Sequence, residues 1–237
     1  MTEIKEVIIL AGGFGTRLKK VVKEVPKPMA DINGKPFLHY LIQFYEQKGV
    51  EHIILSVGYL HKIIEDYFKD RYGKVKISYV IESEPLGTGG AIIKSLLTAQ
   101  TDQVLTVNGD TMFFVEPKEI SAFHDEKKAD ITMVIRQVED VSRYGSVLLD
   151  DNKRITGFSE KNTSSGKGRI NGGVYLINKH LLLNKRFPQR FSIEKDYFEK
   201  DYSNTKIYGK DCNGYFIDIG IPEDYAKAQK EFKTLFK

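Results

Sequence analysis

The residues best suited to chemistry lie in the first 29 positions, where a glycine loop follows an apolar run and two cations follow the loop. Val7 to Ala11 is apolar and predicts a short buried strand. The next four residues, 12–15, read Gly-Gly-Phe-Gly, and glycines there let backbone N–H groups point inward as an anion nest. Arg17 adds a planar fork that suits phosphate oxygens, and Lys27 adds a second charge between two prolines. This arrangement predicts a binding site for a triphosphate.

Two common phosphate-binding motifs do not describe this loop. The dinucleotide fingerprint G-x-G-x-x-G is not met, because Gly13 and Gly15 are followed by Leu18. The Walker pattern is not met either, because no G-K-[ST] closes the loop. Taken by themselves, the three glycines could also form a tight turn without a ligand.

Two aspartates follow predicted strands. Asp110 ends the string V-L-T-V-N-G-D, and Asp218 lies in G-Y-F-I-D-I-G. Open α/β sheets bind ligands at the carboxyl ends of their strands, and a carboxylate there can hold Mg²⁺ together with phosphate oxygens. Each aspartate could instead precede and cap a helix, and the residues alone leave both interpretations open.

A second glycine-rich stretch runs over residues 82–90 with the sequence E-S-E-P-L-G-T-G-G. Its glycines permit a close approach of the backbone to a flat ligand. A carboxylate at Glu82 can accept from both N1–H and N2–H₂ of guanine, whereas uracil offers N3–H between two carbonyl oxygens. The alternative is a glycine-rich helix entry with a solvated glutamate.

Strands and helices alternate along the chain, which predicts a doubly wound α/β sheet. The spacing of apolar residues predicts helices over 36–48, 60–72, 117–127 and 223–236, one starting near Gly89, and short ones near 180–183 and 193–197. It predicts strands over 52–57, 76–81, 103–107, 131–136, 146–149, 154–158, 170–177 and 214–217. A turn is expected over 31–35 and a loop over 162–168. No linker or repeat interrupts the pattern, so one domain over residues 1–237 is expected.

The composition is that of a globular protein, with 41% hydrophobic and 29% charged residues. The net charge of +4 is spread along the chain, so no nucleic-acid-binding arm is expected. The longest apolar run near the N-terminus is too short for a signal peptide or a membrane span. The single cysteine, Cys212, excludes an intramolecular disulfide and a cysteine-rich metal site. These features predict a cytoplasmic protein.

The string A-G-G-x-G-T-R-L followed by K-P-M, with N-G-D and D-I-G further along, resembles the sugar-1-phosphate nucleotidyltransferases, also called nucleotide-sugar pyrophosphorylases. The resemblance covers Ile8 to Tyr225. It implies a Rossmann-like α/β fold of the GT-A type with a mixed sheet. The nucleotide-binding part would span about 1–110 and the sugar-phosphate-binding part about 111–237. Some members carry a C-terminal β-helix of hexapeptide repeats, which this sequence does not show.

The resemblance also implies roles for individual residues. Arg17 and Lys27 would act on the triphosphate with Asp110, and Asp110 and Asp218 would hold Mg²⁺. The nucleotide would lie against Leu10, Ala11, Gly12, Gly13, Gly15, Thr16, Glu82, Gly87, Thr88, Asn108 and Gly109. The sugar phosphate would lie against Tyr144, Gly145, Glu160, Lys161 and Asn171, and Asn171 begins the string Asn171-Gly172-Gly173, which resembles the N-x-G sugar contact of the family. In the implied reaction an oxygen of a sugar 1-phosphate attacks the α-phosphorus of a nucleoside triphosphate, and pyrophosphate leaves.

The loop P-L-G-T-G-G resembles the guanylyl members, most closely those that act on D-glycero-α-D-manno-heptose 1-phosphate in bacterial surface-polysaccharide pathways. GTP and this sugar phosphate are therefore the expected substrates. The alternatives are mannose-1-phosphate guanylyltransferase and a uridylyltransferase for another sugar 1-phosphate. Two alternatives come from other classes, a glycosyltransferase and a silent regulatory subunit. The presence of all four charged residues, Arg17, Lys27, Asp110 and Asp218, favours an active nucleotidyltransferase over both. The oligomeric state is left open, with a homo-oligomer among the options.

Overall fold

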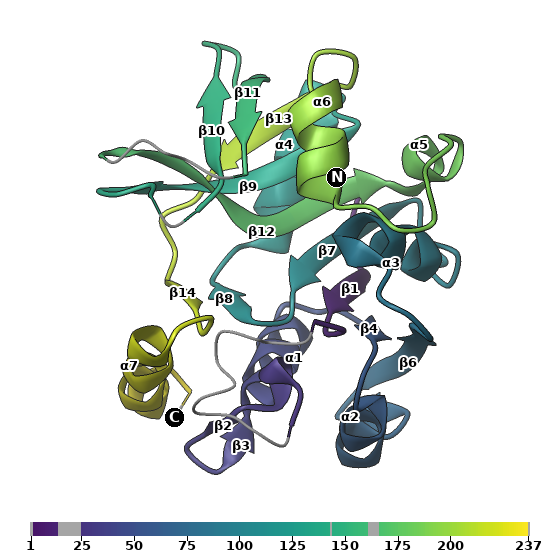
Figure 1. Cartoon of the computed structure of the whole chain (residues 1–237), viewed down its shortest axis with the longest axis vertical. Coiled ribbons are helices and arrows are strands. Elements are labelled where there is room, and N and C mark those ends of the chain that lie inside the picture. The colour runs from purple at the N-terminus through teal and green to yellow at the C-terminus, as the bar shows by residue number, and fades with distance from the viewer. Residues whose placement is uncertain (1, 14–24, 143, 161–165, 237) are drawn as a thin grey trace.

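Four parallel strands form the centre of the structure, a computed structural model that describes residues 2–13, 25–142, 144–160 and 166–236. They are β1 (Glu6–Leu10), β4 (His52–Val57), β6 (Val75–Ile81) and β7 (Gln103–Asn108). Their order is β7-β1-β4-β6, so the chain moves outward from β1 to β6 and then returns to the other side of β1 (Figure 1). This reversal places a topological switch point beside the carboxyl end of β1, where such sheets bind ligands.

Antiparallel strands from the second half of the chain extend the same sheet. β12 (Gly168–Asn178) pairs with both β7 and β9 (Ile131–Val138). β10 (Ser146–Leu149) and β11 (Ile155–Ser159) form a hairpin beside β12, while β13 (Ile207–Asp211) pairs with β9 and β5 (Arg71–Tyr72) with β6. Among the described residues, ten strands belong to this sheet. The β7–β12 pairing joins the two halves of the chain.

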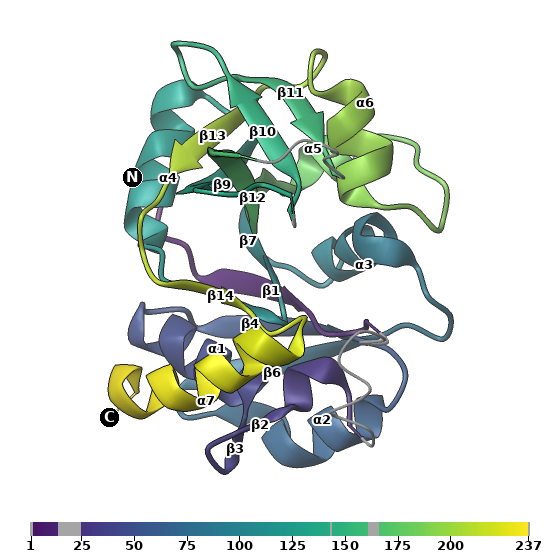
Figure 2. The same ribbon diagram turned by 60° about the vertical axis from the view of Figure 1, so that its left-hand side comes forward.

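Two short ladders lie outside the large sheet. β8 (Thr111–Phe113) pairs antiparallel with β14 (Phe216–Asp218), and β2 (Asp31–Ile32) pairs with β3 (Lys35–Pro36). The C-terminal helix α7 (Pro222–Leu235) follows β14. It lies against α1 (Phe37–Gln47), where the rings of Phe37 and Phe232 stack with centroids 5.7 Å apart (Figure 2). The β8–β14 ladder therefore connects the end of the chain to the strand ends of the central sheet.

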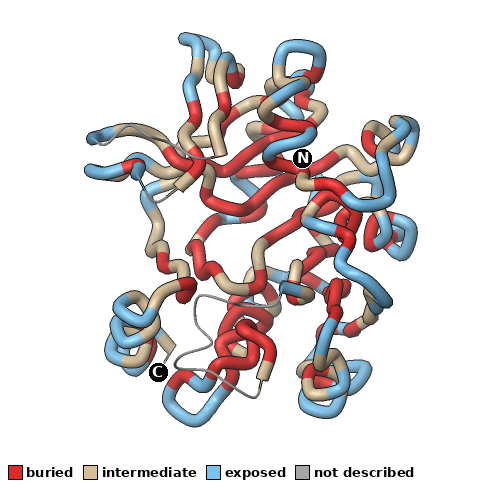
Figure 3. The backbone as a smooth tube through the Cα atoms, viewed as in Figure 1, coloured by how far each residue is buried: buried red, intermediate tan, exposed pale blue. Residues whose placement is uncertain are grey.

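Helices cover both faces of the sheet. One apolar cluster contains side chains of α1, α2 (His61–Phe68), α4 (Pro117–Lys127) and α7, together with Val7 and Ile9 of β1. The other contains side chains of α3 (Gly87–Leu96), α5 (Lys179–Leu183) and the π-helix Ile193–Phe198, together with Ile8. Alternation of successive strand residues between two faces explains why Ile8 and its neighbours lie in different clusters. Figure 3 shows that the buried backbone follows the central strands. A short helix, α6 (Glu199–Asp201), continues from the π-helix.

Most of the predicted elements are confirmed. The helix over 117–127 and the strands over 52–57 and 146–149 have the predicted bounds, and most of the others agree within two residues at each end. In the part of the chain that the structure describes, no helix is long and apolar enough to cross a membrane.

The predicted helix over 60–72 is wrong in its last turn. It begins at His61 and ends at Phe68, because Lys69 has a φ of +56° and Arg71–Tyr72 pairs with Val75–Lys76 as a hairpin. The predicted turn over 31–35 contains the β2–β3 hairpin, and the strands β8 and β13 were not predicted. Within the predicted loop over 162–168, residues 162–165 lie outside the described residues, and Gly168 begins β12.

Candidate active site

Lys27, Asp110 and Asp218 form a charged cluster at the carboxyl end of the central strands. Lys27 Nζ lies 2.5 Å from Asp110 Oδ2 and 3.3 Å from Asp218 Oδ1. The lysine side chain is 9% exposed, whereas the aspartate side chains are 33% and 25% exposed. Lys27 begins the 3₁₀ turn Lys27–Met29, directly after Pro26. One ammonium group thus lies between two carboxylates, and the three groups together carry one net negative charge.

The β8–β14 ladder brings the two aspartates together, although they are 108 positions apart in the sequence. In its register Asp218 lies opposite Thr111, the residue after Asp110. The backbone N–H of Ile219 donates to the Asp110 carbonyl oxygen over 3.0 Å, and the N–H of Gly220 donates to Asp218 Oδ1 over 2.7 Å. Burial and the nearby Asp110 carboxylate raise the pKa of Asp218, because both disfavour its charged form.

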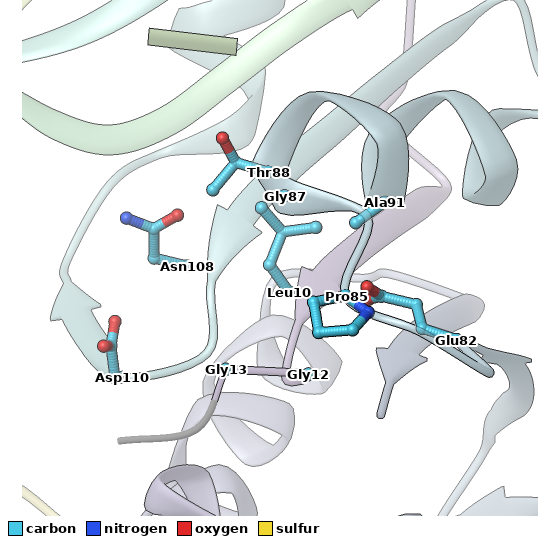
Figure 4. A pocket seen from close by; sticks show the side chains of 10 residues that line it. All are labelled: Leu10, Gly12, Gly13, Glu82, Pro85, Gly87, Thr88, Ala91, Asn108 and Asp110. Carbon is cyan, nitrogen blue, oxygen red and sulfur yellow. The ribbon is translucent and has the colours of Figure 1, made fainter. Parts of the chain in front are cut away.

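A cavity of about 290 Å³ lies beside this cluster and is called here the nucleotide-side cavity. Eight of its ten lining residues were predicted to bind the nucleotide or the metal: Leu10, Gly12, Gly13, Glu82, Gly87, Thr88, Asn108 and Asp110. Pro85 and Ala91 complete the lining. Figure 4 shows Asn108 and Asp110 on one side of the cavity and Glu82, Pro85 and Ala91 on the opposite side. The predicted residues Ala11 and Gly109 do not line it, but Gly109 N–H donates to the Leu10 carbonyl oxygen over 2.9 Å.

Close backbone contacts explain two of the glycines around this cavity. A Cβ atom at Gly12 would lie 2.7 Å from Glu82 Oε1, and one at Gly109 would lie 2.6 Å from the Leu10 carbonyl oxygen. Both distances are too short for a carbon atom, so a side chain would displace the loop or the glutamate. Gly12, directly after the first strand and Ala11, therefore gives room to the Glu82 carboxylate.

Glu82 follows β6 and is held by two neighbours. Ser56 Oγ donates to Oε1 over 2.9 Å, and the Leu86 N–H donates to Oε2 over 3.2 Å. A carboxylate has about four acceptor positions, and the donors in the described part of the chain occupy two of them, which leaves two for a ligand. The carboxylate is therefore oriented in advance at the wall of the cavity.

A second cavity of about 190 Å³ lies on the other side of Asp110 and is called here the sugar-side cavity. Four of the five residues predicted to bind the sugar phosphate line it: Tyr144, Gly145, Glu160 and Asn171. Asp110 and Asp218 line it as well. Asn108 and Asp110 line both cavities, so the two spaces meet at the end of β7.

Gly172 and Gly173 of the predicted N-x-G string line this cavity too, whereas three of its residues were not predicted: Thr111, Glu194 and Phe216. Phe216 could have been found, because it lies two residues before Asp218 on one strand and therefore on the same face. Gly173, with a φ of +68°, lies against Asn108: a Cβ there would be 2.6 Å from Asn108 Nδ2. Glu194 gave no signal in the sequence, since it is one of several acidic residues in a short predicted helix.

Four predicted site residues lie outside the described residues: Gly15, Thr16, Arg17 and Lys161. In the described ranges, no group of three or more His, Cys, Asp or Glu side chains is placed to hold a metal ion. Two carboxylates and an opening to both cavities are nevertheless a donor set that suits a cation shared with a substrate.

Comparison with known proteins agrees with this geometry. Residues 6–234 match the family model described as Nucleotidyl transferase. The chain belongs to this family. A protein of Aneurinibacillus thermoaerophilus named D-glycero-alpha-D-manno-heptose 1-phosphate guanylyltransferase is 46% identical over 228 residues, which are 96% of this chain and 98% of the relative. A Campylobacter jejuni protein of the same name is 40% identical over 220 residues, 93% and 96% of the two chains.

The fold of this nucleotidyl transferase also matches solved structures. HddC from Yersinia pseudotuberculosis, in a crystal structure as a complex with GMP-PN, superposes with a TM-score of 0.86 and 39% identity, over 97% of this chain and 100% of HddC. The predicted α/β nucleotidyltransferase fold and the family resemblance are thereby confirmed.

Proposed function

We propose that this nucleotidyl transferase moves the guanylyl group of GTP to D-glycero-α-D-manno-heptose 1-phosphate. An oxygen of the sugar phosphate attacks the α-phosphorus, the bond to the bridging oxygen of the β-phosphate breaks, and GDP-heptose and pyrophosphate result. The observation that carries the proposal is the meeting of two cavities at Asp110, beside Lys27. Such a site holds two substrates with their reacting groups side by side, and positioning of this kind lowers the barrier of a two-substrate reaction. The names of the Aneurinibacillus and Campylobacter relatives and the GMP-PN in HddC support the choice of substrates.

The nucleotide would lie in the nucleotide-side cavity with its base at Glu82. The two remaining acceptor positions of that carboxylate suit N1–H and N2–H₂ of guanine. Gly87, Thr88 and Asn108 would border the nucleoside, and the triphosphate would extend toward Gly13 and the residues after it. Arg17, Gly15 and Thr16, proposed from the sequence, would contact the phosphates there.

Mg²⁺ is proposed to be held by Asp110 and Asp218. Hard oxygen ligands suit this ion, and it commonly takes one or two carboxylates together with phosphate oxygens and water. Lys27 compensates one of the two negative charges, so the cluster retains a negative charge that a cation would neutralise. When bound, the ion would offset negative charge on the reacting phosphates. Lys27 would keep the two carboxylates in place and add positive charge beside the α-phosphate.

The sugar phosphate would lie in the sugar-side cavity. Glu160 and Asn171 would bind sugar hydroxyl groups, Tyr144 and Gly145 would border the ring, and Lys161 would meet the 1-phosphate. The continuous pairing of β7 with β12 supports a single domain with a nucleotide part over about 1–110 and a sugar part over about 111–237. We further propose that the enzyme works in the cytoplasm and supplies GDP-heptose for surface-polysaccharide synthesis.

The decisive experiment is a matrix of four nucleoside triphosphates against a panel of sugar 1-phosphates, scored by pyrophosphate release. We expect GTP with the heptose 1-phosphate to give the highest kcat/KM. A preference for mannose 1-phosphate would instead indicate a mannose-1-phosphate guanylyltransferase, and a preference for UTP would indicate a uridylyltransferase. Sugar transfer to an acceptor without pyrophosphate release would indicate a glycosyltransferase, and nucleotide-sugar binding without turnover would indicate a silent subunit.

A further inference from the structure

Glu194 is a buried carboxylate in the wall of the sugar-side cavity to which the proposed reaction assigns no role. It lies on the π-helix Ile193–Phe198, and its residue is 7% exposed. Removing a carboxylate from water is costly unless hydrogen-bond donors replace the water. The donors around Glu194 therefore indicate what the side chain is held for.

One carboxylate oxygen of Glu194, Oε2, holds the wall of the nucleotide-side cavity. Thr88 Oγ1 donates to Oε2 over 2.5 Å, and Ser192 Oγ donates to it over 2.7 Å. Thr88 Oγ1 accepts in turn from the Ile193 N–H over 3.0 Å. A hydroxyl group has one hydrogen, so these two contacts set the direction of the Thr88 side chain. Because Thr88 lines the nucleotide-side cavity, this contact joins the walls of both cavities.

The other oxygen, Oε1, has acceptor capacity left. Tyr175 OH donates to Oε1 over 3.4 Å and accepts from Asn171 Nδ2 over 2.6 Å. Burial and the charge of Glu194 raise the pKa of Tyr175, so the phenol keeps its proton and donates. Within the described part of the chain Tyr175 is the donor to Oε1, whereas a carboxylate oxygen accepts two hydrogen bonds. One acceptor position at Oε1 remains for a donor in the cavity.

The charge of the sugar-side cavity near Glu194 indicates which end of a sugar phosphate binds there. Glu160 and Glu194 both line the sugar-side cavity. Two carboxylates repel a phosphate group, whereas hydroxyl groups donate to them. This part of the cavity therefore suits the hydroxyl-bearing end of the sugar.

We propose that Glu194 determines sugar specificity: Oε1 accepts a hydrogen bond from one sugar hydroxyl group while Oε2 holds Thr88. The inference rests on the proposed function, since it requires a sugar 1-phosphate as substrate. A sugar that presents that hydroxyl with the opposite configuration leaves the buried oxygen without its donor and is rejected. Glu194 also ties the position of the sugar to the wall that borders the nucleotide.

The test compares Glu194→Gln with wild type on the parent sugar 1-phosphate and on a set of its monodeoxy analogues. We expect wild type to lose roughly tenfold to a hundredfold in kcat/KM on one analogue, the factor that a hydrogen bond to a charged group contributes. On the parent substrate, kcat/KM of Glu194→Gln should be lower than that of wild type by a similar factor. Removing the hydroxyl group from the sugar should then lower kcat/KM of this variant little further, and its KM for GTP should equal that of wild type. Lys195→Gln, an exposed neighbour on the same helix, is the control and should match wild type.

Equal losses of the two enzymes on every analogue would overturn the proposal, as would an equal rise of KM for GTP. If Glu194→Gln does not fold, Ser192→Ala gives the same comparison, because it removes a donor that orients Oε2 and Ser192 lines neither cavity; Ser192→Thr, which keeps the hydroxyl group, should retain the wild-type penalties. An unchanged penalty for every deoxy analogue in Ser192→Ala would then refute the inference. Pyrophosphate release by wild type decides the proposed function separately, and the comparison is made with the sugar 1-phosphate that wild type uses.

Discussion

Replacing Lys27 by methionine removes the ammonium group that lies between Asp110 and Asp218. Methionine keeps much of the volume of the lysine stem, so the change is mainly one of charge. The net charge of the cluster changes from −1 to −2, because the cation that pairs with both carboxylates is lost. We expect a loss of folding stability as well as a loss of activity, because Lys27 is placed to support both.

The size of the stability loss follows from the two distances. With the dielectric constant of water, Coulomb's law gives roughly 1.7 kcal/mol for a contact at 2.5 Å and roughly 1.3 kcal/mol for one at 3.3 Å. Partial burial strengthens both attractions, and desolvation of the ammonium group opposes them. Removing one partner of a buried ion pair costs about 3–5 kcal/mol, and since the aspartates are a quarter to a third exposed we expect about 2–4 kcal/mol.

Two assays separate the loss of stability from the loss of activity in Lys27→Met. Denaturant unfolding in chelator should show the full stability loss, and magnesium should restore part of it, because a bound cation replaces the missing positive charge. Pyrophosphate release should fall by roughly 10²–10³ at saturating magnesium, as for the loss of a preorganised charge contact. Lys153→Met is the control: it breaks a surface pair with Asp211 at 3.0 Å and should cost less than about 1 kcal/mol without changing turnover. Wild-type stability in chelator together with near-normal turnover of Lys27→Met would refute the reasoning.

Three further predictions concern the base, the metal and pH. Glu82→Gln should lower the ratio of kcat/KM for GTP to that for ATP by roughly tenfold, as a paired base contact is worth about 1–3 kcal/mol; an unchanged ratio would exclude Glu82 from base recognition. Asp110→Asn should nearly abolish turnover, and chelator should do the same to wild type, while full activity in excess chelator would contradict the metal proposal. Burial lowers the pKa of His124 below its ordinary value of 6.5, so the unfolded chain takes up this proton first as the pH falls. The free energy of unfolding should therefore decrease below about pH 6.5, and His124→Gln should reduce that slope, measured by denaturant titrations between pH 5 and 8.

Much of the fold could be predicted because the signals are local. The period of apolar residues identified the alternating strands and helices, and glycines marked the loops after two of the strands. The one misjudged helix shows where such reasoning stops: the apolar pattern continues to Tyr72, but pairing with β6 draws Arg71 and Tyr72 into a strand. Pairing between strands overrides local preference because it satisfies backbone groups that a helix would otherwise pair.

The candidate site was predictable to the extent that its residues follow strands. Glu82, Asn108 and Asp110 each lie at the last residue of a parallel strand of the central sheet or just beyond one, and such positions gather at one edge of an α/β sheet. Asp218 ends β14 outside that sheet, so its place beside Asp110 depends on the ladder with β8. Glu194 was not predictable, since its burial depends on contacts with Thr88 and Tyr175 from distant parts of the chain.

The sequence by itself determined the class of fold and the kinds of side chain available to a nucleotide and a sugar phosphate, and it predicts a triphosphate site at the glycine-rich loop after the first strand. The tertiary structure decided which of them act together. Lys27, Asp110 and Asp218 form one charged cluster only because the antiparallel ladder of β8 and β14 closes a separation of 108 residues. No local pattern in the sequence specifies that β8 pairs with β14. The register of this pair depends on how the whole chain packs around the sheet, which the linear sequence does not display.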